Sequence, residues 1–463
     1  MKITLQGATG GEVTGSAYLI ETNQTKILVD CGLFQGSREA SVLNHAAVGA
    51  TGLQAVLLTH AHLDHTGRLP LLAKQGFNGP IFATPATIEM TGLILRDAAK
   101  IQSQDAERQN RKHLRAGEPP VVPLYSPEDA EAIIRLLRPV TYQTPVNVAP
   151  GIQARFVEAG HMLGSASIEL QINEGGRQRT VVFSGDLGPK GAPILRDAEP
   201  FTRADLLFME STYGDRDHRP FPDTVREFIE IVKEASAQKG KLLVPTFAVG
   251  RAQMLTALLA WMFRNKHVEP FPVFLDSPMA IEASAIYNRH TELFDEEALA
   301  FLQDGSIARD LATLRSTVTP EESRQINACD GPCLVMAGAG MCNASRILHH
   351  LRHNLWNSNT HVLIVGYQAQ GTLGRQLVDG AKKVFIYGEP IAVRARIHTL
   401  GGFSAHAGQT DLMDWFGKIA PSKPRVILTH GDEGPRAALA KLIAERHGIV
   451  PTLPNVGDSI SLE

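Results

Sequence analysis

Four side chains that can bind a metal ion lie within six residues of one another, shortly after the apolar run Ala55–Leu58. They are His60, His62, Asp64 and His65. No packing requirement explains three imidazoles and a carboxylate in one turn, so we interpret the cluster as a metal site. Imidazole and carboxylate ligands without thiolate are typical of zinc, with manganese or iron as alternatives. One short loop cannot complete two tetrahedral shells, and further ligands are expected elsewhere in the chain.

Three more residues of the same chemical types each follow a strand-like apolar run and lie beside glycine. They are His161 in Glu-Ala-Gly-His, Asp186 in Phe-Ser-Gly-Asp and His430 in Leu-Thr-His-Gly. Taken alone, each is more typical of a turn or core residue than of a ligand. Beside the His60 cluster we interpret them as ligands, because seven donors are the expected count for two ions that share a bridging carboxylate.

The pattern His-x-His-x-Asp-His, together with the three distant residues, resembles the metallo-β-lactamase superfamily. The resemblance implies an α/β fold of the αββα type, in which two sheets lie between layers of helices. It implies one zinc ion held by His60, His62 and His161. It implies a second held by Asp64, His65 and His430, with Asp186 bridging both. Two such ions, about 3.5–4 Å apart, can generate a hydroxide at neutral pH and hold a phosphodiester.

Asp30, in Leu-Val-Asp-Cys-Gly, matches the first motif of the same superfamily. The resemblance implies that Asp30 supports the His-rich loop through hydrogen bonds and binds no metal. The match covers the chain before Glu210 and after about Gly388. Because lactamases, thioesterases, glyoxalases and nucleases share the metal motif, it predicts hydrolysis but not the substrate.

Residues in and around the segment between those two regions resemble the β-CASP nucleases. Glu210 in Met-Glu-Ser-Thr-Tyr-Gly, His406 in Phe-Ser-Ala-His-Ala and His430 look like motifs A, B and C of that family. Further matching stretches are Val244–Gln253, Leu275–Ala280 and Gly338–Cys342. A histidine at motif C is typical of the RNA-processing branch, whereas the DNA-repair branch usually carries valine there. The likeness therefore runs along nearly the whole chain and implies an RNA substrate.

Catalytic roles follow from the resemblance and from the chemistry of phosphodiester cleavage. His406 is the expected general acid, because it is not needed to complete the metal shells and the leaving oxygen must gain a proton. Glu210, at the end of an apolar strand, is expected to orient His406 and raise its pKa. Asp64 counts among the catalytic residues as well as the metal ligands. The alternative for the pair is that Glu210 caps a turn and His406 only packs.

Four loops in the same segment follow apolar strands and open helices, at residues 246–251, 276–280, 338–346 and 366–375. Helix N-termini and glycine-rich backbone bind phosphate well. The candidate RNA contacts near these helix starts are Arg251, Ser277, Ser345, Arg346, Thr372 and Arg375. Any one of them alone is more typical of a surface or capping residue. Their repeated position favours a groove that tracks phosphates.

Other reactive residue types receive structural interpretations. Cys329 and Cys333 are interpreted as core thiols. The histidines at 349, 350 and 353 share one helix, and we expect that face to be solvated or close to RNA. Gly338-x-Gly340 lacks the third glycine of a dinucleotide fingerprint, and there is no Walker A motif, so no nucleotide cofactor is expected.

The order of elements suggests one domain inserted into another. Apolar strands alternate with helices after about Glu210, which argues for a parallel sheet covered on both faces. Short strands prevail before that point and return after about Gly388. We therefore expect a metallo-β-lactamase domain at residues 1–209 and 391–463, interrupted at residues 210–390 by a β-CASP domain built on a mainly parallel sheet.

Composition limits the class of protein. The 463 residues include 45 Lys and Arg against 48 Asp and Glu, a net charge of −3 that excludes a polycationic nucleic-acid coat. A local basic groove or bound metal ions can still serve a nuclease. No apolar run approaches the roughly 18 residues of a membrane span, and four cysteines are too few for a disulfide scaffold. We expect a cytoplasmic enzyme with no membrane partner and leave the oligomeric state open, a homodimer included.

The combined prediction is a ribonuclease that uses two Zn²⁺ ions, or Mn²⁺, to cut single-stranded RNA with a metal-activated hydroxide. Endonucleolytic cleavage is the expected mode, with 5′-exonuclease activity as a second one. One alternative is a hydrolase of DNA, a thioester or a lactam on the same metals, which leaves Glu210 and His406 unexplained. Another is a non-catalytic RNA-processing scaffold. Such proteins lose metal ligands, whereas this chain keeps all seven.

Overall fold

The chain folds into two compact units. The computed structural model describes residues 1–36 and 39–462. The first unit comprises Met1–Gly191, Arg196–Asp217 and the chain from His406 onward. The second comprises Ala192–Leu195 and His218–Ala405.

These bounds differ from the sequence-based division at residues 210 and 390. Residues 210–217 stay with the first unit because β11 (Leu206–Glu210) pairs in parallel with β20 (Arg425–Thr429) up to Glu210. Residues 391–405 stay with the second unit because β19 (Arg396–Thr399) pairs with β16 (Thr360–Ile364).

The first unit contains two sheets, in the strand orders β21-β1-β2-β3-β4-β5-β6 and β20-β11-β10-β9-β8-β7. The strands of the first sheet are β21 (Ser459–Ser461), β1 (Lys2–Leu5), β2 (Tyr18–Glu21), β3 (Lys26–Val29), β4 (Ala55–Leu57), β5 (Ile81–Ala83) and β6 (Leu137–Pro139). The other strands of the second sheet are β10 (Arg177–Phe183), β9 (Ala166–Glu174), β8 (Ile152–Glu158) and β7 (Val146–Ala149). The parallel pair of β11 and β20 places Glu210 opposite Thr429, beside a segment far away in sequence.

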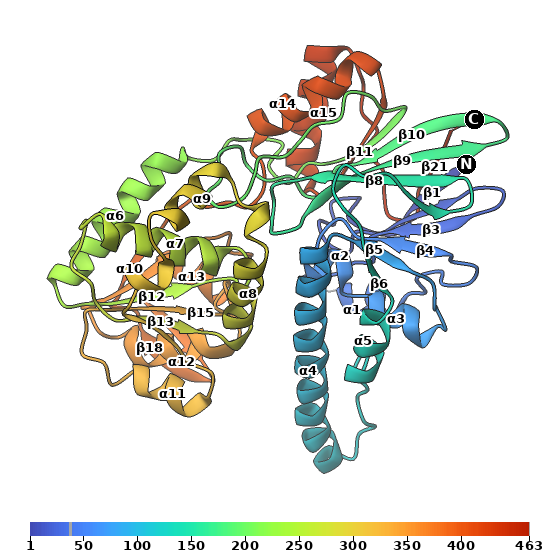
Figure 1. Cartoon of the computed structure of the whole chain (residues 1–463). Helices are drawn as coiled ribbons and strands as arrows, with labels where there is room; N and C mark the ends of the chain where they lie inside the picture. Colours follow the sequence, from blue (N-terminus) through green and yellow to red (C-terminus); the bar gives the residue numbers. More distant parts are fainter. Residues whose placement is uncertain (37–38, 463) are drawn as a thin grey trace. The chain divides into compact units, whose positions relative to one another are not determined.

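Apolar residues fill three layers of the first unit. Along β10, Val181 and Phe183 pack between the two sheets, whereas Val182 packs against helices on the outer side, as the two-residue period of a strand requires. Three helices cover the outer face of the first sheet (Figure 1): α3 (Leu69–Lys74), α4 (Pro85–Ala116) and α5 (Pro127–Ile134). Two cover the outer face of the second: α14 (Gln409–Ile419) and α15 (Glu433–His447). The expected αββα sandwich is confirmed.

Helix α4 is the longest helix of the chain as described, at 32 residues. It begins where the Thr84 side chain accepts a hydrogen bond from the Thr87 backbone N–H, and it ends at Gly117 in the left-handed conformation. Among the residues that the structure describes, no helix is both long and apolar enough to cross a membrane.

A six-stranded sheet in the order β14-β13-β15-β12-β16-β19 forms the centre of the second unit, and its strand pairs are all parallel. Its remaining strands are β14 (Leu314–Ser316), β13 (Val273–Asp276), β15 (Cys333–Ala337) and β12 (Lys241–Pro245). Every residue of β15 is buried, as expected for a strand covered on both faces. One face packs against α6 (Phe221–Ala237) and α7 (Arg251–Arg264), and the other against α12 (Ser345–Asn354) and α13 (Leu373–Val378).

Because the strands are parallel, the loops that follow β12, β13, β15 and β16 gather at one edge of the sheet, which we call the carboxyl edge. The four loops predicted to open helices are these loops. Shorter elements complete the chain: α1 (Ala40–His45), α2 (Leu63–Thr66), α8 (Pro278–Arg289), α9 (Glu296–Gln303), α10 (Ile307–Asp310), α11 (Pro320–Ile326), the hairpin β17 (Lys383–Ile386) and β18 (Glu389–Ala392), and 3-10 turns at Thr291–Leu293 and Ala420–Ser422.

Candidate metal centre

The His-rich segment forms the turn between β4 and α2. His62 is the residue that precedes the first turn of α2, so His60 and His62 lie in the loop before the helix, and Asp64 and His65 lie within it. Gly32 permits this turn to sit close to the β3 loop. A Cβ at Gly32 would lie 1.6 Å from the carbonyl oxygen of Asp64 and 2.7 Å from the amide nitrogen of Ser16, so no other residue fits there.

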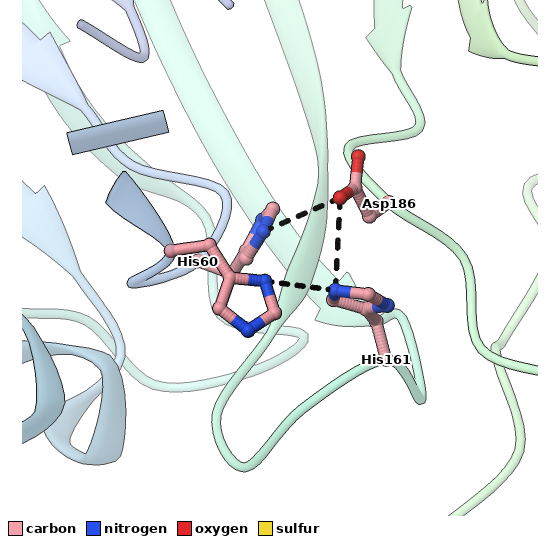
Figure 2. A group of neighbouring side chains, drawn as sticks. His60, His161 and Asp186 are labelled. Carbon is pink, nitrogen blue, oxygen red and sulfur yellow. Dashed lines mark hydrogen bonds and ion pairs between the residues drawn. The ribbon is translucent and has the colours of Figure 1, made fainter. Parts of the chain in front are cut away.

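Four of the predicted ligands form a first group in the first unit. The ligand atoms of His60, His62, His161 and Asp186 all lie within 4.8 Å of one another. Figure 2 shows His60 and His161 facing Asp186, whose Oδ2 is 3.4 Å from Nε2 of His60 and 3.6 Å from Nε2 of His161. Nε2 of His161 is also 3.1 Å from Nδ1 of His62. The fold therefore brings together residues from the loops that follow β4, β8 and β10, and these are the residues predicted to form one metal shell.

A second group contains Asp64, His65 and His430, again within 4.8 Å of one another. Nε2 of His430 lies 3.3 Å from Nε2 of His65 and 3.4 Å from Oδ2 of Asp64. The other carboxylate oxygen of Asp186, Oδ1, lies 3.3 Å from Nε2 of His65. Asp186 thus presents one oxygen to each group, which is the geometry that a bridging ligand needs.

The residues fit a pair of divalent cations. Nε2 of His60 is fully buried and makes no hydrogen bond to any described residue, although a buried imidazole nitrogen normally has a partner. Two Nε2 atoms 3.3 Å apart, those of His65 and His430, need a proton or a cation between them. Burial lowers the pKa of His60, and the neighbouring His65 lowers it further. Burial raises the pKa of Asp186, but His430 and His65 outweigh it and hold that pKa well below its usual range. Neutral imidazole and ionised carboxylate are the forms that bind metal.

Asp30 lies behind the second group and contributes no ligand atom to it. Its carboxylate accepts hydrogen bonds from the backbone and hydroxyl of Thr59, both at 2.8 Å, and from Nδ1 of His65 at 2.7 Å. Asp30 is fully buried. The contact with His65 leaves Nε2 of that ring to face Asp186, so the position of Asp30 suits the supporting role predicted for it.

Two threonine hydroxyls that the sequence analysis did not single out set the orientation of two other histidines. Thr59 donates its hydroxyl proton to Asp30, so the same oxygen can only accept from Nδ1 of His60, 3.1 Å away. Thr212 donates to the carbonyl oxygen of His430 at 3.0 Å and lies 3.0 Å from Nδ1 of that ring. Both hydroxyls therefore favour protonation of Nδ1 and leave Nε2 as the ligand atom. The only signal in the sequence was their adjacency to His60 and Glu210.

His406 and Glu210 form a pair beside the first group. Nδ1 of His406 is 3.3 Å from Oε1 of Glu210, and its Nε2 is 4.0 Å from Oδ2 of Asp186. The centre of the His406 ring lies 4.5 Å from that of His161. Burial lowers the pKa of His406, but the charge of Glu210 and its hydrogen bond outweigh that effect and raise it to about 9.

The predicted RNA contacts of the second unit divide into two kinds. Some serve local structure: the Ser277 hydroxyl accepts from the Ala280 N–H and caps α8, and Thr372 caps α13 in the same way. Ser345 is the first residue of α12. Arg251 begins α7 and Arg375 lies in α13, where it pairs with Asp379 on the surface.

Arg346 is a different case, because its guanidinium contacts the buried carboxylate of Asp276 at 2.5 Å and the carbonyl oxygen of Thr317 at 3.0 Å. Asp276 also lies 2.7 Å from Nε2 of the buried His350. Arg346 is thus held by partners inside the protein, and its phosphate contact stays a prediction. The structure also corrects the expectation of a uniformly solvated histidine face, since His350 points into the core and satisfies Asp276.

Comparison with protein families places three domain descriptions along the chain. The description "Metallo-beta-lactamase superfamily" matches residues 10–246, "Beta-Casp domain" matches residues 252–377, and "Zn-dependent metallo-hydrolase RNA specificity domain" matches residues 390–454. The first of these alone covers about half of the 463 residues.

Similar proteins cover the chain almost from end to end. Ribonuclease TTHA0252 of Thermus thermophilus is 41% identical over 463 residues, which are 99% of this chain and 100% of that protein. Transcription termination factor FttA of Cenarchaeum symbiosum is 33% identical over 98% of this chain and 70% of its own length. A crystal structure of a protein of unknown function from Enterococcus faecalis V583 is 15% identical with a TM-score of 0.57, over 100% of this chain and 99% of that one, and shares the fold.

Proposed function

Because the chain belongs to the metallo-β-lactamase superfamily and carries its Beta-Casp domain, we propose that this metal-dependent hydrolase is a ribonuclease acting on single-stranded RNA. The observation that carries the proposal is the meeting of seven ligand-type side chains with the Glu210–His406 pair in one site of the first unit. The match of residues 390–454 to an RNA specificity domain and the likeness to a ribonuclease support RNA as the substrate.

The two groups of side chains would each hold one ion. The first would use His60, His62 and His161, and the second Asp64, His65 and His430, with Asp186 between them. All donors are imidazole or carboxylate, which favours zinc, with manganese as the alternative. Two ions bound there would supply an activated water and neutralise the charge of the phosphodiester. The protein's own contribution is to hold the donors in place through Asp30 and the hydroxyls of Thr59 and Thr212.

We assign to His406 the protonation of the leaving group. Cleavage that leaves a 5′-phosphate expels a 3′ oxygen, which must receive a proton. Glu210 holds Nδ1 of His406, so Nε2 is the nitrogen that points toward Asp186 and can donate. Glu210 is itself fixed, because Oε1 accepts from the Leu187 N–H at 2.6 Å and Oε2 from the Thr212 N–H at 3.3 Å.

The alternatives explain less of the site. The match of residues 390–454 to an RNA specificity domain favours a phosphodiester of RNA over a thioester or a lactam. A non-catalytic scaffold has no need to keep seven donors in two compact groups. Hydrolysis of DNA by the same residues stays as the second candidate activity, and we propose endonucleolytic cleavage with 5′-exonuclease activity as a further mode.

The direct test uses the full-length protein loaded with zinc or manganese. End-labelled single-stranded RNA, the matching DNA and a circular RNA are incubated with and without a chelator. We expect metal-dependent cleavage of linear and circular RNA to products with 5′-phosphate ends. Products with a 2′,3′-cyclic phosphate, or cleavage that survives complete removal of metal, would contradict the proposal. Cleavage of linear RNA alone would leave only the exonuclease mode.

A further inference from the structure

Phe247 is an exposed aromatic residue at the carboxyl edge of the parallel sheet in the second unit. It lies in the loop between β12 and α7, and 46% of its surface is exposed. The preceding residue, Thr246, is buried, and its N–H donates to the carbonyl oxygen of Ala337 at the end of β15. The base of the loop is therefore anchored in the sheet while the aromatic ring reaches the surface. Among the described residues, Phe247 belongs to neither of the two apolar cores of this unit.

The ring rests on the backbone of two other loops. A Cβ added to Gly340 would lie 2.9 Å from ring carbons Cδ2 and Cε2 of Phe247, closer than real side chains approach. A Cβ added to Gly366 would lie 3.6 Å from Cε2. The ring thus sits where only glycine at 340 leaves room for it. This contact covers the Cδ2–Cε2 edge of the ring with backbone, while the residue as a whole stays 46% exposed.

One buried side chain joins the two loops that carry Gly340 and Gly366. We call this backbone beneath the ring the glycine shelf. Gln368 is 5% exposed, and its amide nitrogen donates to the carbonyl oxygens of Gly340 at 2.9 Å and Gly366 at 3.2 Å. The N–H of Gly374 also donates to the carbonyl oxygen of Met341. The loops after β15 and β16 are therefore held in one arrangement, so the ring rests on a fixed support. An aromatic surface fixed in advance loses little conformational entropy when a ligand covers it.

We propose that Phe247 is a stacking platform for one base of single-stranded RNA, a subsite that rests on the ribonuclease function proposed above. A nucleobase fits because it is flat and about as wide as the ring, and because every base has a face that can stack. In open parallel sheets, ligands bind at the carboxyl ends of the strands. Arg251 begins a helix four residues further on, where helix N-termini suit the phosphates that flank a base. A stable protein interface would need a much wider apolar surface than the exposed rings of Phe247 and Tyr367 offer.

The test is a double-mutant cycle in which one change removes the ring of Phe247 and the other removes one base from the RNA. We call the position of the missing base the gap. A set of short single-stranded RNAs carries one abasic ribose at each position in turn, and kcat/KM is measured for the wild type and Phe247→Ala. Stacking on an aromatic side chain predicts a loss of about 5- to 100-fold for the wild type at one position. Phe247→Ala should lose a similar factor on intact RNA and become insensitive to the gap at that position. Phe247→Tyr should keep the wild-type pattern.

Two further variants control for indirect effects. Phe385→Ala removes another exposed phenylalanine of the second unit, on β17, and should leave every rate unchanged. Gly340→Ala should displace the ring and give part of the Phe247→Ala loss, with an unaltered circular dichroism spectrum. The salt dependence of KM should not change in Phe247→Ala, because stacking releases no counterions.

The outcomes separate this subsite from the function it rests on. If the wild type cleaves RNA but Phe247→Ala keeps both its rate and its sensitivity to the gap, the platform is overturned and the ribonuclease proposal stands. If the wild type cleaves no RNA in the presence of metal, the ribonuclease proposal itself fails.

Discussion

Oε1 of Glu210 serves two partners, since it lies 3.3 Å from Nδ1 of His406 and accepts a hydrogen bond from the backbone N–H of Leu187 at 2.6 Å. Leu187 directly follows Asp186, so the carboxylate that positions His406 also fixes the strand end that carries the central ligand. The proposed proton donor and the proposed metal ligand Asp186 are thereby held by the same carboxylate. This coupling sets a clear expectation for substitutions of either member of the pair.

His406→Ala should slow RNA cleavage by about 10²- to 10⁴-fold, the usual contribution of a general acid. Glu210→Gln should slow it less, because an amide oxygen can still accept from Nδ1 of His406 but no longer supports a positive charge on the ring. Both effects should appear in the rate constant of cleavage measured under single-turnover conditions, with the affinity for RNA unchanged.

Metal content is the control for that experiment. The ligand atoms of Asp186, His406 and His430 also lie within 4.8 Å of one another, so the geometry alone would allow His406 to bind an ion. We expect His406→Ala to keep two metal ions per chain, measured by plasma emission, whereas Asp186→Asn should lower the count. Loss of metal from His406→Ala would assign this residue to the metal shell and withdraw its role as the acid.

Thr212→Val should weaken metal binding at the second group by about 10- to 100-fold, the usual effect of losing a partner behind a ligating histidine. The valine keeps the shape of the side chain but cannot accept from Nδ1 of His430, so the competing tautomer gains population. Thr212→Ser restores the hydroxyl and should restore the affinity. Competition with a chromophoric chelator gives the affinities, and imidazole nitrogen chemical shifts in the metal-free protein report the tautomer. Equal affinities for the valine and serine variants would remove this role.

Arg346→Ala and Arg375→Ala should differ sharply in stability. Arg346 pairs with the fully buried Asp276, and its removal leaves that carboxylate with less compensation, at a cost of about 3 kcal/mol in the free energy of unfolding. Arg375 pairs with Asp379 on the surface, where the loss should stay below about 1 kcal/mol. Urea unfolding at neutral pH measures both. Similar losses for the two variants would contradict the distinction between a buried and a surface pair.

The features predicted best from the sequence are those that depend on one short local pattern. The fully buried strand β15 and the Asp30 loop follow from short apolar runs that end at glycine or at polar residues, and the same reasoning located the turn of His60. Strand β14 was not predicted, and the short strands expected after about Gly388 were not assigned to the parallel sheet that β19 joins, because both strands are three or four residues long and contain no buried residue that would give an apolar pattern. Their place in the sheet depends on pairing with distant strands.

The same limit applies to two basic residues of the second unit. Arg346 and His350 look like surface residues in the sequence, since each lies in a run rich in basic and imidazole side chains. Their partner, Asp276, is 70 residues away from Arg346, at the end of a different strand. The carboxylate of Asp276 meets these basic groups only in the folded sheet. No pattern close to Arg346 or His350 in the sequence indicates that it is there. Thr59 and Thr212 were not predicted for a similar reason, because the role of each hydroxyl depends on the histidine Nδ1 that it faces in the folded protein.

The buried carboxyl of Glu158 should make the stability of the first unit depend on pH. Burial raises the pKa of this carboxyl to about 7, although hydrogen bonds, first that from the Gly160 N–H, lower it in part. The titratable or charged groups that face it are Tyr142 and Arg196. In the unfolded chain a glutamate titrates near 4.3. The folded protein therefore holds this proton more tightly, and the resulting stability is fully present at low pH and lost as the pH rises through about 7.

Glu158→Gln should remove this dependence, because the amide keeps an oxygen for the Gly160 N–H and never ionises. Between pH 6 and pH 8 the wild type should lose about 1 kcal/mol of unfolding free energy relative to the variant, most of it between pH 6 and pH 7. Urea unfolding at several pH values, at one fixed metal concentration, measures the difference. Glu169→Gln, at a partly buried ion pair with Arg155 on the neighbouring strand, is the matched control and should show no such trend. A constant difference between wild type and Glu158→Gln across this range would mean that the Glu158 carboxyl titrates outside it.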